Sequence, residues 1–293
     1  MFDLAHVTDL HLLERNHRER SGLPWQRLHY LSAGRPLDAE ARRARALAAL
    51  QTAGRKAAHV VLTGDLTEDG VPAQFELLAE VLAESGIDPR RLTLVPGNHD
   101  VCSDFDAFQR ALRGPLRAYA ATSGPAGIVP IGQGAWLLPV CTAIPQSVVR
   151  SCGRLADDDV VRIRELAHDA RRARKLPLVA QHHPPHGFGG AAWNWIDGLL
   201  NADVGRSLLD THSRLHVLHG HTHKHESATF APGRAPQAHS GAAAVASADN
   251  VRFYRMSREA LLPVDAHGRG DDACSLRLRG SSTSQNSKIS AAI

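Results

Sequence analysis

Two hydrophobic patterns alternate along the chain. Short, continuous apolar runs are typical of buried strands, and they occupy residues 4–8, 59–63, 92–95, 135–142, 177–180 and 215–218. Longer stretches place apolar residues three or four positions apart and predict helices, at residues 38–56, 72–85, 105–119, 157–175 and around 208–209. Strands that alternate with helices indicate an α/β fold with helices on the faces of a sheet.

The remaining segments are predicted from their polarity. Residues 17–35 are polar and rich in arginine, and residues 187–201 lie between two predicted elements, so both are expected to be loops. Residues 227–230 and 251–256 alternate and predict antiparallel strands, in a second sheet or an added hairpin layer. From residue 268 the chain is polar, so we expect one domain over residues 1–267 and a disordered tail over 268–293.

Composition narrows the class of protein. The 293 residues are 43% hydrophobic and 22% charged, which is ordinary for a soluble globular protein. The net charge is +4, but no dense basic run with interleaved aromatic residues appears, so a nucleic-acid partner is not expected.

Cellular location is also predicted from what the sequence contains. The four cysteines form no C-x-x-C pair and do not suggest a disulfide framework. The first residues lack the pattern of a signal peptide, and no apolar run approaches the roughly 20 residues that span a bilayer. We therefore expect a cytoplasmic protein; a homo-oligomer is possible, and nothing in the sequence decides it.

Polar residues follow five of the predicted strands. In an open α/β sheet, ligands bind at the carboxyl ends of the strands, so side chains there are expected to converge. Three motifs follow strands in the first half of the chain, namely Asp9-x-His11, Gly64-Asp65 and Gly97-Asn98-His99-Asp100. Two more follow strands in the second half, namely His182-His183-Pro184 and Gly220-His221-x-His223.

These residue types indicate a metal centre. Histidine with aspartate suits Zn²⁺, Mn²⁺, Fe or Co better than Ca²⁺ alone. Residues two apart in a strand point the same way, so Asp9 and His11 are expected to face one cation, as are His221 and His223. About seven ligands are too many for one tetrahedral ion and suit two ions ~3.5–4 Å apart with a bridging carboxylate. Such ions activate a shared water for in-line phosphoryl transfer, and a nearby unbound imidazole can protonate the leaving oxygen.

The ordered set of five motifs resembles the calcineurin-like metallophosphoesterase superfamily, over residues 1 to about 225. The resemblance implies a four-layer α/β/β/α sandwich, in which helices flank two mixed β-sheets. It also implies two divalent metal ions and attack on phosphorus by a hydroxide that bridges them. The metals implied are Mn, Fe, Zn or Co.

The resemblance further implies a role for each motif residue. Those implied to hold the first ion are Asp9, His11 and His223. Those implied to hold the second ion are Asn98, His182 and His221, with Asp65 as the bridge. His99 is implied to be the general acid, and Asp100 is expected to orient His99 or a neighbouring group.

The motifs identify the family more closely than they identify the substrate. The motifs look most like the class III cyclic-nucleotide and glycerophosphodiester phosphodiesterases, so a small phosphodiester is the favoured substrate. The alternatives are a pyrophosphate hydrolase of a nucleotide-sugar or lipid conjugate, such as UDP-diacylglucosamine, and a non-catalytic metal-binding scaffold. UDP-diacylglucosamine hydrolases usually carry arginine where His99 stands. Further candidates for substrate contact, each of which could instead be structural, are His183, Trp25, Trp193 and Trp195.

Overall fold

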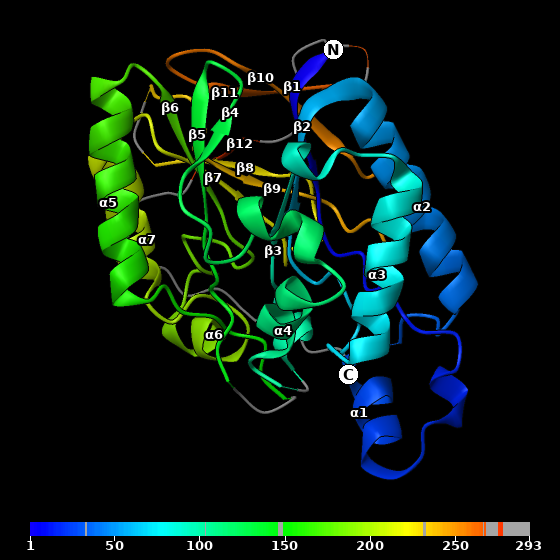
Figure 1. Cartoon of the computed structure of the whole chain (residues 1–293). Coiled ribbons are helices and arrows are strands. Elements are labelled where there is room, and N and C mark those ends of the chain that lie inside the picture. Colours follow the sequence, from blue (N-terminus) through cyan, green and yellow to red (C-terminus); the bar gives the residue numbers. More distant parts are fainter. Residues whose placement is uncertain are drawn as a thin grey trace.

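A computed structural model describes residues 1–32, 34–102, 104–145, 149–230, 233–265 and 267, and the backbone of 275–277. Two mixed β-sheets lie side by side in the middle of the molecule, with helices on both outer sides (Figure 1). Apolar side chains of the two sheets pack against each other and include Leu4, Val61, Leu137, Leu178 and Leu218. The predicted α/β/β/α sandwich is therefore confirmed.

The first sheet has the strand order β11-β10-β1-β2-β3. Its strands are β1 (Phe2–Val7), β2 (Ala57–Thr63), β3 (Leu92–Val95), β10 (Arg252–Met256) and β11 (Leu261–Val264). The parallel strands β1, β2 and β3 place Leu4 opposite His59 and Val61 opposite Thr93. Because these three strands are parallel, the segments that follow them meet at one edge of the sheet.

The second sheet has the order β12-β8-β9-β7-β6-β5-β4. Its strands are β4 (Val129–Ile131), β5 (Ala135–Pro139), β6 (Leu176–Ala180), β7 (His216–His219), β8 (Ser227–Thr229), β9 (Ala238–Ser240) and β12 (Ser275–Arg277). Strands β5, β6, β7 and β9 are parallel, with Leu178 opposite His216. The carboxyl ends of β6 and β7 therefore also lie together.

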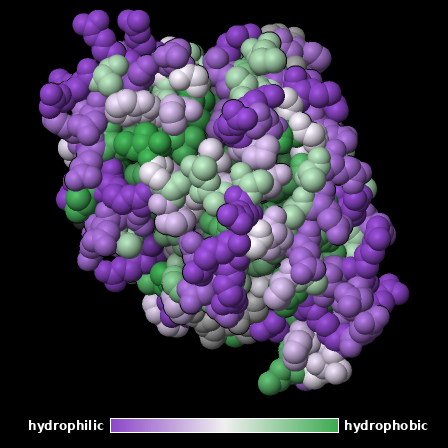
Figure 2. Space-filling model, viewed as in Figure 1, coloured by the Kyte–Doolittle hydropathy of each residue, from purple (hydrophilic) through white to green (hydrophobic). Residues whose placement is uncertain are grey.

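Helices cover the outer face of each sheet. Those against the first sheet are α2 (Ala39–Lys56), α3 (Pro72–Ser85) and α4 (Ala107–Arg113). Those against the second sheet are α5 (Asp157–Arg172) and α7 (Ala202–Thr211). Short 3₁₀ turns are η1 (His17–Glu19), η2 (Pro89–Arg91), η3 (His99–Val101) and η4 (Arg117–Thr122). Hydrophilic side chains cover the outer helices on both sides of the view in Figure 2, as expected for helices that bury one face.

Both segments predicted to be loops contain a helix, so these two predictions were wrong. Helix α1 (Gly22–Ser32) projects from the end of the sandwich where β1, β2 and β3 finish, and α6 (Ala191–Ile196) lies at the same end (Figure 1). Helix α1 buries Leu28 against Leu13, a residue that lies outside the helix. Tertiary packing of this kind decides whether a short helix forms, and hydrophobic spacing within the segment does not reveal it.

The late strands formed as predicted but do not pair with each other. Strand β10 pairs with β1 in the first sheet, whereas β8 pairs with β9 in the second. The predicted tail lies outside the described residues except for 275–277, which pair with β8, so the tail and the domain boundary at residue 267 stay predictions. No helix in the described part of the chain is long and apolar enough to cross a membrane.

Candidate metal centre

The seven predicted ligands come together where the strand ends of the two sheets meet. Asp9 Oδ1 lies 3.0 Å from His223 Nε2, which joins the segment after β1 to the segment after β7. His182 Nε2, after β6, lies 3.3 Å from Asp65 Oδ2 and 3.1 Å from Asn98 Oδ1. Residues from both sheets therefore build one centre.

Most of the ligands lie on left-handed backbone. A positive φ is uncommon for a residue other than glycine, and in the described residues it occurs at Asp9, His11, Asp65, Arg174, His221 and His223. Five of these six are predicted ligands. Such conformations cost about 1–3 kcal/mol each and cluster at functional sites. The centre is therefore built from strained turns that the surrounding fold holds in place.

This finding corrects the reason given for the pairing of Asp9 with His11. Strand β1 ends at Val7, so the two residues do not occupy alternate positions of an extended strand. Instead their backbone N–H groups donate to the carbonyls of Gly64 (3.0 Å) and Asp65 (2.9 Å), which follow β2. The two side chains face one centre because hydrogen bonds to the neighbouring loop fix their turns.

Small residues allow the ligand loops to approach each other. A Cβ on Gly97 would lie 2.1 Å from Asp65 Oδ1, and one on Gly220 would lie 2.0 Å from Thr8 Oγ1. Neither separation is possible without displacement of the carboxylate or of the Thr8 hydroxyl that donates to Asp9 Oδ2 (2.6 Å). The glycines in the two motifs therefore leave room for the ligands.

The first group of ligand atoms fits a divalent ion. His11 Nε2 lies 3.9 Å from Asp9 Oδ1 and 3.8 Å from Asp65 Oδ2. These separations are too long for hydrogen bonds, and this buried nitrogen has no hydrogen-bond partner among the described residues. Two ligand atoms that each lie about 2.0–2.2 Å from one ion can be at most about 4.0–4.4 Å apart, so these separations leave room for an ion between the side chains. Asp9, His11 and His223 thus form a set that a cation would satisfy.

The second group shares Asp65 with the first. The ligand atoms of Asp65, His182 and His221 all lie within 4.8 Å of one another. His221 Nε2 contacts the backbone oxygen of Asp197 (2.5 Å), which leaves Nδ1 as the nitrogen for an ion. Asp65 Oδ2 faces both His11 and His182, so its position fits the predicted bridge.

The charges of the ligands shift one another's pKa. Burial alone would lower the pKa of His182, but the carboxylates of Asp65 and Asp9 outweigh it and raise the pKa to about 9. Burial and the charge of Arg35 lower the pKa of His11 to about 4. Burial works to raise the pKa of Asp65, yet His182 and His99 hold it well below its ordinary value. The Asp65 carboxylate is therefore ionised, as a metal ligand must be.

His99 has one ring nitrogen fixed and one directed to the centre. Its Nδ1 contacts the backbone oxygen of Glu68 (2.6 Å), so this nitrogen carries a proton. Its Nε2 lies 3.9 Å from Asp65 Oδ2, and the backbone N–H donates to Asp65 Oδ1 (3.0 Å). The ring belongs to neither of the two ion groups described above, and forms a further candidate group with His11 and Glu68. Its Nε2 lies where a general acid is expected.

Of the two roles expected for Asp100, its contacts fit the orientation of neighbouring groups and not of the His99 ring. Its carboxylate accepts from the backbone N–H groups of Gly97 (2.8 Å), Leu66 (3.1 Å) and Thr67 (2.8 Å), and from the Thr67 hydroxyl (2.7 Å). Burial, helped by the charge of Asp65, raises the pKa of this carboxyl to about 6. Asp100 therefore ties the loop after β2 to the loop after β3.

A cleft of about 330 Å³ opens over the centre. Its lining includes Asp65, Asn98, His99, His221 and His223. The other lining residues come from α1, from the segments after α1 and before α5, and from the end of α6, and include Tyr30, Leu31, Arg35, Arg150 and Asp197. The cleft therefore presents two guanidinium groups and an aromatic ring beside the candidate ligands, and sequence reasoning gave neither arginine a role.

Only some of the residues that were candidates for substrate contact lie near this cleft. Trp25 packs with its neighbour Leu37 on the cluster around Leu28 and does not line the cleft. Trp193 and Trp195 are 64% and 56% exposed on α6. The ring of Trp195 lies 4.3 Å from the guanidinium of Arg150, a lining residue. Trp195 is thus next to the cleft, whereas Trp25 is part of the packing of α1.

His183 has no ring nitrogen left for a substrate. Its Nδ1 contacts Thr142 Oγ1 (2.8 Å) and its Nε2 contacts the backbone oxygen of Ser151 (2.9 Å). The side chain is fully buried beside His182. These contacts make His183 a support for the ligand loops, so the prediction that it touches substrate loses its basis.

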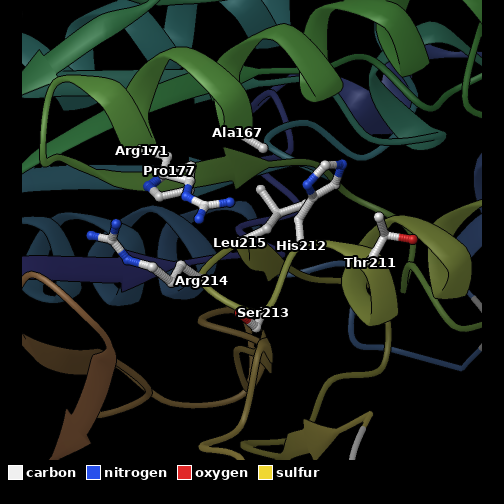
Figure 3. A pocket seen from close by; sticks show the side chains of 8 residues that line it. All are labelled: Ala167, Arg171, Pro177, Thr211, His212, Ser213, Arg214 and Leu215. Atoms are coloured by element: carbon white, nitrogen blue, oxygen red, sulfur yellow. The ribbon is translucent and has the colours of Figure 1, made fainter.

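A second cavity, of about 270 Å³, lies away from the centre (Figure 3). Arg171 of α5, Thr211 of α7 and Pro177 near the start of β6 line it, so it lies by the amino ends of the strands. Arg214 in its wall pairs with Glu259 (3.2 Å). None of the candidate metal groups in the described residues includes a residue of this cavity.

The chain is similar to known proteins in its sequence family and in its fold. Residues 2–225 match the family of calcineurin-like phosphoesterases. A dimetal phosphatase from Danio rerio aligns over 91% of this chain and 95% of its own, with a TM-score of 0.61 and 13% identity. The protein TT1561 of Thermus thermophilus aligns over 89% and 96%, with a TM-score of 0.49 and 11% identity.

The likeness to the Danio rerio structure supports the fold alone, because the identity is low. No curated protein matches the sequence. The family match is the stronger result, since it spans every motif from Asp9 to His223. This chain belongs to the calcineurin-like phosphoesterase family.

Proposed function

We propose that this protein is a phosphodiesterase that uses two divalent metal ions to hydrolyse a small phosphodiester. The observation that carries the proposal is the shared position of Asp65, whose Oδ2 lies 3.8 Å from His11 Nε2 and 3.3 Å from His182 Nε2. One carboxylate between two ligand groups suits a pair of ions. Asp9, His11 and His223 would hold one ion, and Asn98, His182 and His221 the other.

The ions, when bound, supply the nucleophile and offset the charge that grows on the phosphoryl oxygens. The chain's own residues then complete the reaction. Because the Glu68 carbonyl occupies Nδ1 of His99, a proton on Nε2 points into the cleft and can pass to the departing alkoxide. That alkoxide leaves as an alcohol, and the phosphomonoester remains.

The first experiment removes metal with a chelator, restores Mn²⁺, Fe²⁺, Zn²⁺ or Co²⁺, and compares bis-p-nitrophenyl phosphate with p-nitrophenyl phosphate. Diester hydrolysis that requires metal supports the proposal. Hydrolysis of the monoester alone contradicts it and indicates a phosphatase. Two bound ions without turnover of any ester or pyrophosphate would instead favour the non-catalytic scaffold.

The pyrophosphate alternative has an observation of its own. Arg35 and Arg150 line the cleft beside the ligands, and guanidinium groups suit a second phosphate. Faster hydrolysis of a nucleoside diphosphate sugar or UDP-lipid than of cyclic nucleotides or glycerophosphodiesters would favour this alternative. The cytoplasmic location, the absence of a nucleic-acid partner and the oligomeric state stay predictions.

A further inference from the structure

Glu68 lies behind the first group of ligands, and its side chain is fully buried. Its Oε2 is 3.0 Å from His11 Nδ1, and its backbone oxygen is 2.6 Å from His99 Nδ1. Glu68 thus contacts two histidines, the predicted ligand His11 and the predicted general acid His99. In each ring it contacts Nδ1, the nitrogen that faces away from the centre.

These contacts determine which ring nitrogen of each histidine is directed to the metal centre or to the cleft. A histidine that binds a metal usually donates its other ring N–H to a carboxylate or carbonyl, which fixes the tautomer and the ring orientation. The carboxylate of Glu68 lies 3.0 Å from Nδ1 of His11, the ring nitrogen that faces away from the centre, so Nε2 points to Asp9 and Asp65. The carbonyl of Glu68 contacts Nδ1 of His99 in the same way and leaves Nε2 facing the cleft.

The carboxylate is itself held on three sides. Its Oε1 accepts from the Ser32 hydroxyl (2.7 Å) and from Arg35 (3.3 Å), and its Oε2 accepts from the buried Arg42 (2.8 Å). These donors come from α1, the segment after it, and α2. A charge so deeply buried needs partners of this kind, and together they leave the carboxylate one position against His11.

We infer that Glu68 is a positioning residue of this centre, which orients His11 through its carboxylate and His99 through its carbonyl. The inference rests on the proposed function, in which His11 binds the first ion. A substitution of Glu68 changes its side chain and leaves its backbone carbonyl in place. A Glu68 variant therefore loses the carboxylate beside His11 but keeps the carbonyl that contacts His99.

The next residue provides a matched control. Asp69 is also fully buried and also pairs with two arginines, Arg20 (2.7 Å) and Arg27 (3.2 Å). Its remaining hydrogen bonds among the described residues are with Gln74, and none reaches a predicted ligand. Asp69→Asn therefore removes the same charge from the same loop without touching the centre.

The experiment titrates Mn²⁺ into the metal-free full chain by calorimetry, for wild type, Glu68→Gln and Asp69→Asn. Circular dichroism confirms that each chain is folded. We expect Glu68→Gln to weaken the binding of one Mn²⁺ ion by about 10–100-fold and to leave the affinity for the other ion unchanged. Asp69→Asn should retain both affinities. At limiting Mn²⁺ the Glu68 variant should lose kcat for bis-p-nitrophenyl phosphate with little change in KM.

Two results would overturn the inference. One is a folded Glu68→Gln that binds both ions as wild type does, and the other is an equal loss of affinity in Asp69→Asn. If Glu68→Gln does not fold, Glu68→Asp decides by the same criteria, because it keeps the charge near Arg42 but withdraws it from His11. A wild-type chain that binds fewer than two Mn²⁺ ions would refute the proposed function and this inference with it.

Discussion

His99 can be tested by a substitution that keeps its structural contact and removes its chemistry. In His99→Asn the amide nitrogen can take the place of Nδ1 and donate to the Glu68 carbonyl, which now lies 2.6 Å from the ring. The variant then lacks only Nε2, the atom that faces the cleft. Because His99 belongs to neither ion group of the proposed centre, both ions should remain bound.

The expected loss depends on the leaving group. General acid catalysis is worth about 10²–10⁴ in rate, which corresponds to about 2.7–5.4 kcal/mol at 1.36 kcal/mol for each factor of ten. That loss should appear with 3′,5′-cyclic AMP or a glycerophosphodiester, whose alkoxide must be protonated as it departs. Bis-p-nitrophenyl phosphate should lose much less, because p-nitrophenolate leaves without a proton.

The assay measures kcat/KM for both kinds of diester, beside metal content by elemental analysis. His168→Asn is the control, since His168 is exposed on α5 and contacts only its neighbour Asp169 among the described residues. Loss of metal in His99→Asn would make His99 a ligand and refute its assignment. An equal loss with both leaving groups would show that His99 does not act as the acid.

The contacts described above support three further predictions. Asp65→Ala should lose both ions, because both groups share this carboxylate; retention of two ions per chain in elemental analysis would rule out the bridge. Arg150→Ala should weaken a nucleoside diphosphate as an inhibitor of diester hydrolysis more than the monophosphate; an equal effect would remove the support for a second phosphate. Burial lowers the pKa of His59 and of His216 to about 4, so each favours the folded state above pH ~6.5 and loses that contribution as the pH falls toward 4, by about 1.4 kcal/mol per unit. Urea unfolding between pH 7 and 5 should show a shallower decline for His59→Gln; an unchanged slope would contradict the shift.

Local sequence predicted the strand ends and the helices that cover the two sheets, but not α1 or α6. Apolar runs that stop at a glycine locate strands, and Gly86, with φ of 72°, ends α3 where expected. The segment predicted as one helix over residues 105–119 divides at Gly114 and Pro115 into α4 and η4, because proline cannot continue a helix. Since the ligands follow strand ends directly, their convergence could be predicted once the strands were recognised as parallel.

Long-range contacts explain what the sequence did not predict. Glu68 is only three residues after Asp65, but its partner Arg42 is 26 residues earlier, so nothing local in the sequence indicates that the charge is buried. Helix α1 depends on Leu28 and on Ser32, whose partners are likewise distant. The left-handed turns at Asp9 and His11 follow from hydrogen bonds to the loop after β2. The alternation of apolar and polar residues along the sequence does not reveal such hydrogen bonds.

The origin of the ligands in both sheets has a consequence for folding cooperativity. In the proposed centre each ion joins residues after β1, β2 or β3 to residues after β6 or β7. An ion at 100 times its Kd stabilises the folded chain by about 2.7 kcal/mol, and this energy is shared by both halves. Metal removal should therefore raise amide hydrogen exchange at Asp65 and His182 together, as one thermodynamic unit, although 117 residues separate them in sequence.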